Sequence, residues 1–241
     1  MYKYTSYNMS TSQAVVKAQK KVLQAVAKAD LPVYLAAGTA LAIRYSHRYS
    51  EDLDFFTQRW SQALHRKLAK HIERATGFSF RLLDERIKPR LAKVAAYEFS
   101  IAKGAFMKVD VIEDFDPLLQ PVEPDGIASM DDLYLRKVRA VIGWTTKPSS
   151  TGQMVAGGRQ DAKDLFDLWY LSTHYAPLHE WFPAHFSRQD YQRLTRWLPA
   201  MTGQATTFAL LDVAPGCDTK QIMRHMEQQV YERLNRRYVP T

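Results

Sequence analysis

The chain has 241 residues, of which 46% are hydrophobic and 12% aromatic, and its formal net charge is +8. This composition excludes a disordered chain and provides for one sizeable core, or for a core with a helical extension. A single cysteine, Cys217, excludes a disulfide framework and indicates a reducing compartment. No run approaches the roughly 18 apolar residues of a membrane span, and the polar start lacks a signal-peptide core. We therefore expect a cytoplasmic protein with no membrane partner.

The first half of the chain alternates between helix and strand patterns. Gly77 marks the end of one helix, and Lys103-Gly104 marks the turn of a hairpin. The expected elements, in chain order, are helix 13–29, strand 33–36, helix 39–47, strand 53–57, helix 61–76, strand 78–84 and a hairpin of strands 91–102 and 105–113.

The second half is predicted to be helical. Three prolines between residues 117 and 124 mark a connection, and the helical pattern starts after Ser129. It is broken by the basic segment Thr145–Gly158, which reads either as a mobile substrate gate or as a linker.

A Gly-Thr turn and two alternating carboxylates form the first motif. A turn at Gly38-Thr39 that opens a short helix offers free backbone N–H groups to a phosphate. Asp52 and Asp54 follow at i, i+2, so in an extended segment they point to one face, about 7 Å apart at their Cα atoms. The apolar residues between and after them point into the core. Such a pair suits Mg²⁺, although alone it is more often a solvated strand face or turn.

A third acid, Asp110, lies on the predicted strand 105–113. One face of this strand is fully apolar, and Asp110 lies on the other face with Lys108. A carboxylate on a mostly apolar strand lowers stability unless it is paired or ligates a cation. A salt bridge to Lys108 or to a neighbouring strand and ligation of a metal are both compatible with this pattern.

The helix that follows Ser129, a plausible N-cap, carries a lysine inside its apolar arc. The spacing of the apolar residues places Lys137 on the inner face and Arg136 and Arg139 on the far, solvated face. Because a buried ammonium is costly without an anion, Lys137 either snorkels along the helix or contacts a phosphate.

The last motif runs from Arg159 to Tyr170. On a helix, Asp164 shares a stripe with Leu168 and points into the fold, whereas Asp167 points more outward. Asp164 then either pairs with a core arginine, orients Lys137 or takes a direct part in the chemistry.

Charge is divided unevenly along the chain. Residues 109–132 contain eight acidic residues and no lysine or arginine, so the basic excess lies elsewhere. Basic residues around an acidic site suit a polyanionic acceptor, although any single run is more often a solvated helix face. The basic segments are Arg59–Arg74, Arg81–Lys93 with Arg86, Lys88 and Arg90 in one turn, Arg136–Lys163, and the C-terminal residues Arg224, Arg233, Arg236 and Arg237.

The turn and the acids resemble the polymerase-β-like nucleotidyltransferase superfamily. The run from Gly38 through Arg44, Arg48 and Ser50 to Asp52-Leu53-Asp54-Phe55-Phe56 more closely resembles the AbiEii-type nucleotidyltransferases, the toxins of type IV toxin–antitoxin systems. Lys137-Val138-Arg139-Ala140 and Asp164 to Leu168 resemble the later motifs of that family. One departure is Ala37, where the family usually has a second glycine, which bears on phosphate contact through residue 37.

The resemblance implies an α+β nucleotidyltransferase fold, with a small mixed sheet flanked by helices in residues 1–122 and a helical domain in residues 123–241. It implies transfer of a nucleotidyl group from an NTP to an acceptor hydroxyl with release of pyrophosphate. In the implied site, Asp52, Asp54 and Asp110 hold Mg²⁺ (or Mn²⁺), Asp110 helps deprotonate the acceptor, Gly38, Thr39, Arg48 and Lys137 bind the nucleotide, and Lys137 and Asp164 come from the helical domain.

The resemblance also implies partners. Its members are implicated in modifying tRNA acceptor ends, in toxin–antitoxin or abortive-infection systems, which implies an RNA acceptor and a cognate antitoxin. Two alternatives stay open: a nucleotidyltransferase with a small acceptor such as an aminoglycoside, and a catalytically silent module that binds nucleic acid or a partner.

Overall fold

The computed structural model describes residues 9–88, 91–143, 146–148, 154–156, 158–201 and 203–238. They form two compact units. The first consists of the residues up to Ile43 together with Ser50–Asp132, and the second consists of Arg44–Tyr49 together with the residues from Leu133 onward. Of the described helices, none is long and apolar enough to cross a bilayer.

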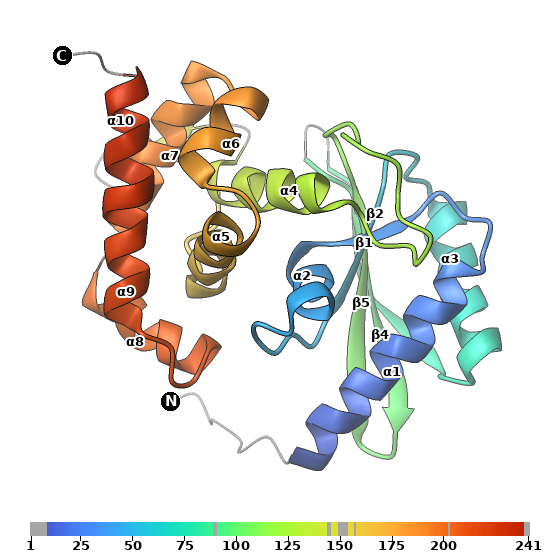
Figure 1. Cartoon of the computed structure of the whole chain (residues 1–241). Coiled ribbons are helices and arrows are strands. Elements are labelled where there is room, and N and C mark those ends of the chain that lie inside the picture. Colours follow the sequence, from blue (N-terminus) through green and yellow to red (C-terminus); the bar gives the residue numbers. More distant parts are fainter. Residues whose placement is uncertain are drawn as a thin grey trace. The chain divides into compact units, whose positions relative to one another are not determined.

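A mixed five-stranded sheet forms the centre of the first unit (Figure 1). The order of the strands is β1-β2-β5-β4-β3; β2 and β5 are parallel, and the other neighbours are antiparallel. The predicted small mixed sheet flanked by helices is therefore confirmed. The strands are β1 (Tyr34–Ala36), β2 (Leu53–Thr57), β3 (Phe80–Arg86), β4 (Val94–Ala102) and β5 (Ala105–Glu113).

The two faces of this sheet differ because side chains alternate along a strand. Val109 of β5 is buried and is the register partner of Tyr97, whose hydroxyl lies 2.6 Å from Nδ1 of His65 in α3 (Gln62–Thr76). α1 (Met9–Ala27) contacts α3, β4 and β5. Figure 1 shows α2 (Ala37–Tyr45) on the other side of the sheet. The helices α1 and α3 thus cover one face, and Asp110, on the alternate parity of β5, belongs to the opposite face.

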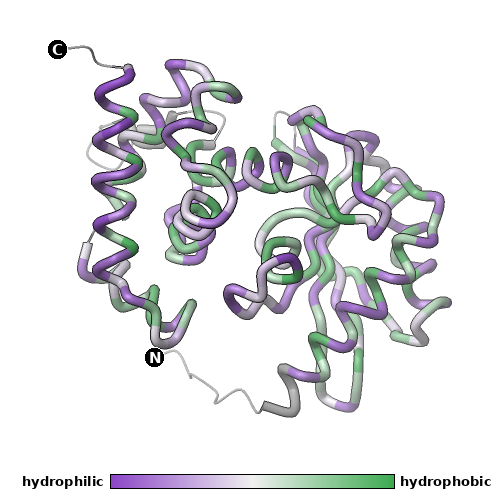
Figure 2. Tube along the Cα trace, in the orientation of Figure 1, coloured by the Kyte–Doolittle hydropathy of each residue, from purple (hydrophilic) through white to green (hydrophobic). Residues whose placement is uncertain are grey.

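Local signals explain the ends of these elements. Ser61 accepts a hydrogen bond from the backbone of Leu64 at the start of α3, and Gly77 ends the helix at φ +76°. Beyond its first turn, α1 alternates between hydrophobic and hydrophilic residues (Figure 2), as an amphipathic helix on a sheet does. The outer edge of β1 is covered, because Leu35 exchanges backbone hydrogen bonds with residues 126–128.

The second unit is built mainly of helices. Its core includes Trp197, Phe182 and Val230, which are at most 1% exposed, and Tyr134 stacks on Trp181 with ring centroids 4.3 Å apart. The helices are α4 (Met130–Ile142), α5 (Ala162–His174), α6 (Leu178–His185), α7 (Arg188–Ala200), α8 (Gln204–Val213), α9 (Thr219–Arg224), a π-helical stretch (His225–Tyr231) and α10 (Glu232–Tyr238).

The segment after α4, expected to be a mobile substrate gate or a linker, contains a short hairpin. β6 (Thr146–Pro148) pairs with β7 (Met154–Ala156) in antiparallel register, while residues 144, 145, 149–153 and 157 lie outside the described part of the chain. Gly158 then passes close to α4, where a Cβ atom would lie 2.1 Å from the carbonyl oxygen of Val141. Only glycine permits this approach, which brings Arg159 toward α5.

Candidate active site

Two of the predicted metal ligands are register partners on neighbouring strands. Asp54 on β2 faces Asp110 on β5, and parallel neighbours lie about 4.8 Å apart. Asp54 is half-buried and Asp110 is 7% exposed, while Asp52 precedes β2 and is exposed. Leu53 and Phe55 are fully buried, as predicted. The sheet therefore presents two carboxylates side by side, with Asp52 just before them in the chain.

Lys108 balances this negative charge. Its Nζ lies 2.6 Å from Oδ2 of Asp110, which is the salt bridge that the sequence pattern allowed. Burial alone would lower the pKa of Lys108, but the hydrogen bond to Asp110 and the charges of Asp110, Asp52 and Asp54 raise it above its ordinary value. All three acids are thus close enough to act on one ammonium group.

The chemistry of these acids fits a divalent cation. Oδ1 of Asp110 is buried and accepts no hydrogen bond from the described residues. Carboxylate oxygens are the ligands that Mg²⁺ prefers, together with phosphate oxygens and water. Within the described ranges, no three or more histidine, cysteine, aspartate or glutamate side chains converge as a complete metal site. Asp54 and Asp110 are therefore the acids that fit the ion, and further ligands would come from substrate or solvent.

The Gly38-Thr39 turn is tied to the chain that carries Asp52. The Thr39 hydroxyl donates a hydrogen bond to the backbone oxygen of Asp52 and lies 2.7 Å from the hydroxyl oxygen of Ser50. Gln19 of α1 is buried. Its side-chain nitrogen donates hydrogen bonds to the backbone oxygens of Ser50 and Glu51, and each donor–acceptor distance is 2.9 Å. The sequence reading missed Gln19, because a polar residue inside an amphipathic helix pattern carries no mark of its partner.

Ala37 opens α2 in an unusual backbone conformation. Its φ of +63° lies in the left-handed region, where a Cβ atom costs about 1–2 kcal/mol. This is the position at which the chain departs from the glycine of the AbiEii pattern. The turn has therefore kept the glycine-type geometry without the glycine.

The second unit contains a buried charge network around Asp167. This side chain is fully buried; it accepts hydrogen bonds from Nε and Nη2 of Arg48, at 2.6 and 2.8 Å, and lies 2.7 Å from Nε2 of His47. Its other neighbour is Nζ of Lys137, at 2.6 Å. The prediction that Asp167 points outward is wrong. Residues three apart share a helix face, so Asp167 turns inward beside Asp164.

Lys137 is held between two carboxylates. Its Nζ lies 2.8 Å from Oδ1 of Asp164, and the Lys137 side chain is 3% exposed. The same oxygen of Asp164 accepts a hydrogen bond from Arg159 at a distance of 3.0 Å. The predicted inward direction of Lys137 is confirmed, and it does not snorkel to solvent. The anions at its ammonium group are Asp164 and Asp167, and Arg48 likewise pairs with Asp167.

The electrostatics of this network favour the charged forms. Burial would raise the pKa of Asp167, but the charge of Lys137 and the hydrogen bonds from Arg48 and His47 hold it well below the usual range of a carboxyl group. In turn, Asp167 raises the pKa of Arg48 against the effect of its burial. Asp167 and Arg48 therefore stabilise each other in their charged forms.

The prediction that Arg136 and Arg139 lie on a solvated face of α4 is also wrong. Arg136 is 6% exposed. Arg139 lies 4.9 Å from the ring centroid of Phe186 and 3.2 Å from a carboxylate oxygen of Asp190. Most of α4 is enclosed, so its arginines have partners inside the protein.

The comparison with known proteins identifies the family. Residues 22–238 match the family described as "Nucleotidyl transferase AbiEii toxin, Type IV TA system". The chain belongs to this family of AbiEii nucleotidyltransferase toxins.

Solved structures share the fold. The crystal structure of JHP933 from Helicobacter pylori is 20% identical, with a TM-score of 0.55 over 94% of each chain. A second crystal structure, of an H. pylori chain provisionally described as a nucleotidyltransferase, is 20% identical, with a TM-score of 0.56 over 96% of this chain and 98% of that one. A segment of 43 residues is 51% identical to the uncharacterized protein aq_aa25 of Aquifex aeolicus (strain VF5). The match covers 17% of this chain and about a fifth (21%) of that relative.

The substitution Ala37→Gly tests the backbone at the turn. Because glycine adopts a positive φ without strain, we expect the free energy of unfolding in urea to rise by about 0.5–1 kcal/mol. Ala40→Gly, three residues later in the same helix, is the control and should lower it by about 1 kcal/mol. A fall in stability for Ala37→Gly would contradict the strained geometry.

The substitution Asp167→Asn tests the buried network. It leaves the cations of Lys137 and Arg48 undercompensated, so we expect a loss of about 3–5 kcal/mol in the free energy of unfolding at pH 7. Because the folded-state pKa of Asp167 is depressed, its stabilisation is present above its unfolded pKa, about 3.9, and is lost as pH falls below that value.

Urea unfolding from pH 3 to 7 measures this difference. The difference in the free energy of unfolding between the parent and Asp167→Asn should become smaller below pH 4. Asp212→Asn, on an exposed position of α8, should change stability by no more than about 0.5 kcal/mol. A gap that is constant with pH, or as small as that of the control, would show that the Asp167 carboxylate does not stabilise the unit as an anion.

Proposed function

We propose that this protein is a Mg²⁺-dependent nucleotidyltransferase that transfers a nucleoside monophosphate from an NTP to a hydroxyl of RNA, at the 3′ end of tRNA, as the toxin of a type IV toxin–antitoxin system. The observation that carries the proposal is the pairing of Asp54 and Asp110 across adjacent strands, with a buried oxygen of Asp110 lacking a partner among the described residues. A cognate antitoxin is the partner that the family implies.

The acids would have the central role. Asp54 and Asp110, with Asp52 beside them, would hold Mg²⁺ (or Mn²⁺), which when bound neutralises triphosphate charge and stabilises the attacking and leaving oxygens. Asp110 would also help to take up the proton of the acceptor hydroxyl. The hydroxyl oxygen forms a bond to the α-phosphorus as the bond from that phosphorus to the bridging oxygen breaks, and pyrophosphate leaves.

The turn would hold the terminal phosphates. Because the Thr39 hydroxyl is already engaged with Asp52 and Ser50, Gly38 and Thr39 would contact phosphate through their backbone N–H groups. The hydroxyl then has a positioning role, since it connects the turn to the chain that leads into β2.

Lys137, Arg48 and Asp164 enter this proposal through the family motifs. Their observed partners are other charged residues of the second unit, chiefly Asp167. A direct contact of Lys137 or Arg48 with the nucleotide would exchange a carboxylate for a phosphate oxygen, which keeps the cation paired. The net charge of +8 favours a polyanionic acceptor over a cationic aminoglycoside.

The substitution Asp54→Ala tests the assignment. We expect transfer activity to fall at least 100-fold, because loss of a required metal ligand removes several kcal/mol of transition-state stabilisation. The assay incubates the protein with each labelled NTP, Mg²⁺ and total RNA, and measures label in RNA, with a chelator as a second arm.

Asp84→Asn is the matched control, since it removes an exposed carboxylate of β3 in the same unit. Its activity and the folding of both variants, by circular dichroism, should equal those of the parent. Activity of Asp54→Ala within about threefold of the parent would rule out Asp54 as a metal ligand.

A further inference from the structure

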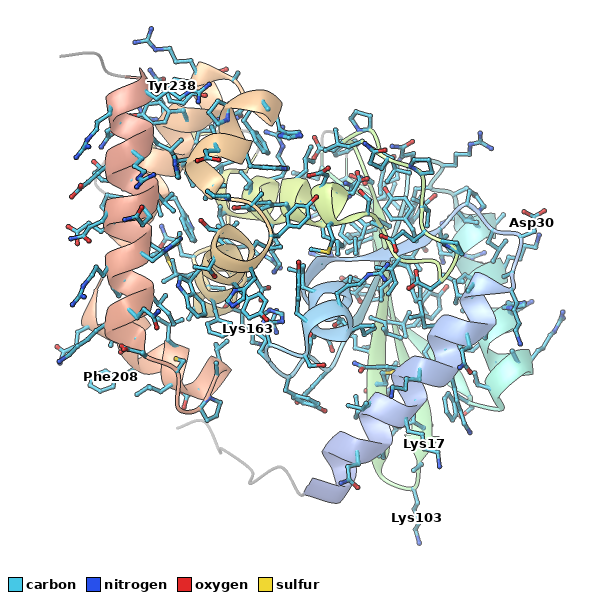
Figure 3. All side chains as sticks on the ribbon, in the orientation of Figure 1. Lys17, Asp30, Lys103, Lys163, Phe208 and Tyr238 are labelled. Atoms are coloured by element: carbon cyan, nitrogen blue, oxygen red, sulfur yellow. The ribbon has the colours of Figure 1, made fainter. Side chains whose placement is uncertain are left out.

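A basic groove lies between the end of α1 and the side of α3. It has a volume of about 590 Å³ and is lined by five lysine and arginine residues and one acid, Asp30. Figure 3 labels Asp30 on the loop that follows α1, beside α3. The five cations are Lys28, Arg66, Lys67, Lys70 and Arg74.

Most of this charge is not neutralised locally. Arg66 lies 3.9 Å from a carboxylate oxygen of Glu85, but Lys28, Lys67, Lys70 and Arg74 form no ion pair with any residue that the structure describes. His71 also lines the groove. Its Nε2 lies 2.9 Å from the backbone oxygen of Ala25, so this side chain connects α3 to α1. Excess positive charge that faces an open groove attracts an anion.

The cations of α3 are arranged in a row. Lys67, Lys70 and Arg74 follow at spacings of three and four residues, which places them on one face of the helix. From Lys67 to Arg74 the row extends about 10 Å along the axis. Its length fits a series of phosphates better than a single phosphate group.

The chemistry of the lining favours nucleic acid over protein. The apolar contribution comes from Ala29, Leu31 and Ala63, with no aromatic residue. Protein interfaces are centred on buried aromatic, methionine or arginine anchors and are depleted in lysine, whereas nucleic-acid surfaces hold phosphates with lysine and arginine. The lining of the groove is therefore typical of a nucleic-acid-binding surface.

The groove and the acids lie on opposite sides of the sheet. α3 covers the face that carries Tyr97 and Val109, and Asp110 belongs to the opposite face. A helix layer alone is about 10 Å thick. Only a large acceptor that extends around the unit can therefore contact the groove and also present a hydroxyl to the acids.

We propose that the α1–α3 groove docks the phosphate backbone of a folded RNA, away from the end that is modified. This inference rests on the proposed function for the identity of the acceptor, and it makes Lys67, Lys70 and Arg74 docking residues with no part in the chemistry. A short oligonucleotide acceptor does not reach the groove, so its use is independent of these residues.

The test compares two triple variants that lower the net charge equally. Lys67→Gln/Lys70→Gln/Arg74→Gln alters the groove. The control, Lys103→Gln/Lys220→Gln/Arg196→Gln, alters exposed cations outside it; Figure 3 labels Lys103 at the tip of the β4–β5 hairpin, away from Asp30. Lysine, arginine and glutamine have similar helix propensities, so both variants should fold, which thermal unfolding checks.

Binding of labelled bulk tRNA is measured without NTP at several salt concentrations. For the groove variant we expect Kd to rise at least tenfold and the slope of log Kd against log salt to fall by about 2–3, because three phosphate contacts no longer release counterions. The control should change Kd less than threefold. With NTP added, KM for tRNA should rise at unchanged kcat, and KM for a short 3′-end oligonucleotide should not change.

A groove variant that binds tRNA as the control does would overturn the inference, as would a parent protein that does not bind tRNA. Loss of affinity for an acidic polypeptide such as polyglutamate, with tRNA affinity intact, would assign the groove to a protein partner instead. Failure of the proposed function is distinguishable, because a parent that binds tRNA through the groove but labels no RNA contradicts the transferase assignment and not the docking site.

Discussion

The buried carboxylate of Asp167 is the interaction on which the second unit depends. An isolated carboxylate in a protein interior costs several kcal/mol, so it persists only because Lys137, Arg48 and His47 surround it. These partners come from α4 and from residues 44–49, while Asp167 comes from α5. One side chain thus joins two helices and a segment that is distant from both in the sequence.

The position of that segment in the chain gives the network its functional interest. Residues 44–49 follow the Gly38-Thr39 turn and precede Asp52 and Asp54. The second unit therefore holds a piece of chain with candidate site residues on both sides of it. In the first unit, Thr39 and Gln19 fix the continuation of this chain at Ser50 and Asp52. The Thr39 hydroxyl and the Gln19 amide, for which no contact with substrate is proposed, thus position the chain that leads into the acids.

The acids themselves depend on strand register. Leu53, Phe55, Val109 and Val111 are buried, and a slip of one residue would turn them outward and the carboxylates into the core. The apolar pattern that specifies the sheet therefore also specifies the face on which Asp54 and Asp110 meet. Lys108 then stabilises the two neighbouring anions.

Sequence patterns predicted what depends on local periodicity. The bounds of β2 and β5 agree with the expected strands 53–57 and 105–113, since alternation marks both and the Lys103-Gly104 turn marks the start of β5. They did not predict the partner of Arg48, which lies 119 residues away, or the inward direction of Asp167, because a helical stripe of apolar residues does not reveal a buried ion cluster. The positive φ of Ala37 was likewise not predictable, because an alanine in the sequence gives no indication of a left-handed backbone.

The central claim, that Asp54 and Asp110 hold the catalytic metal, is tested most directly by anomalous diffraction from crystals grown with Mn²⁺ and a non-hydrolysable NTP. We expect an anomalous peak within ligand distance of both carboxylates, with triphosphate oxygens completing the shell. A nucleotide-bound structure in which no peak touches either acid, and in which Lys108 alone neutralises Asp110, would contradict the claim.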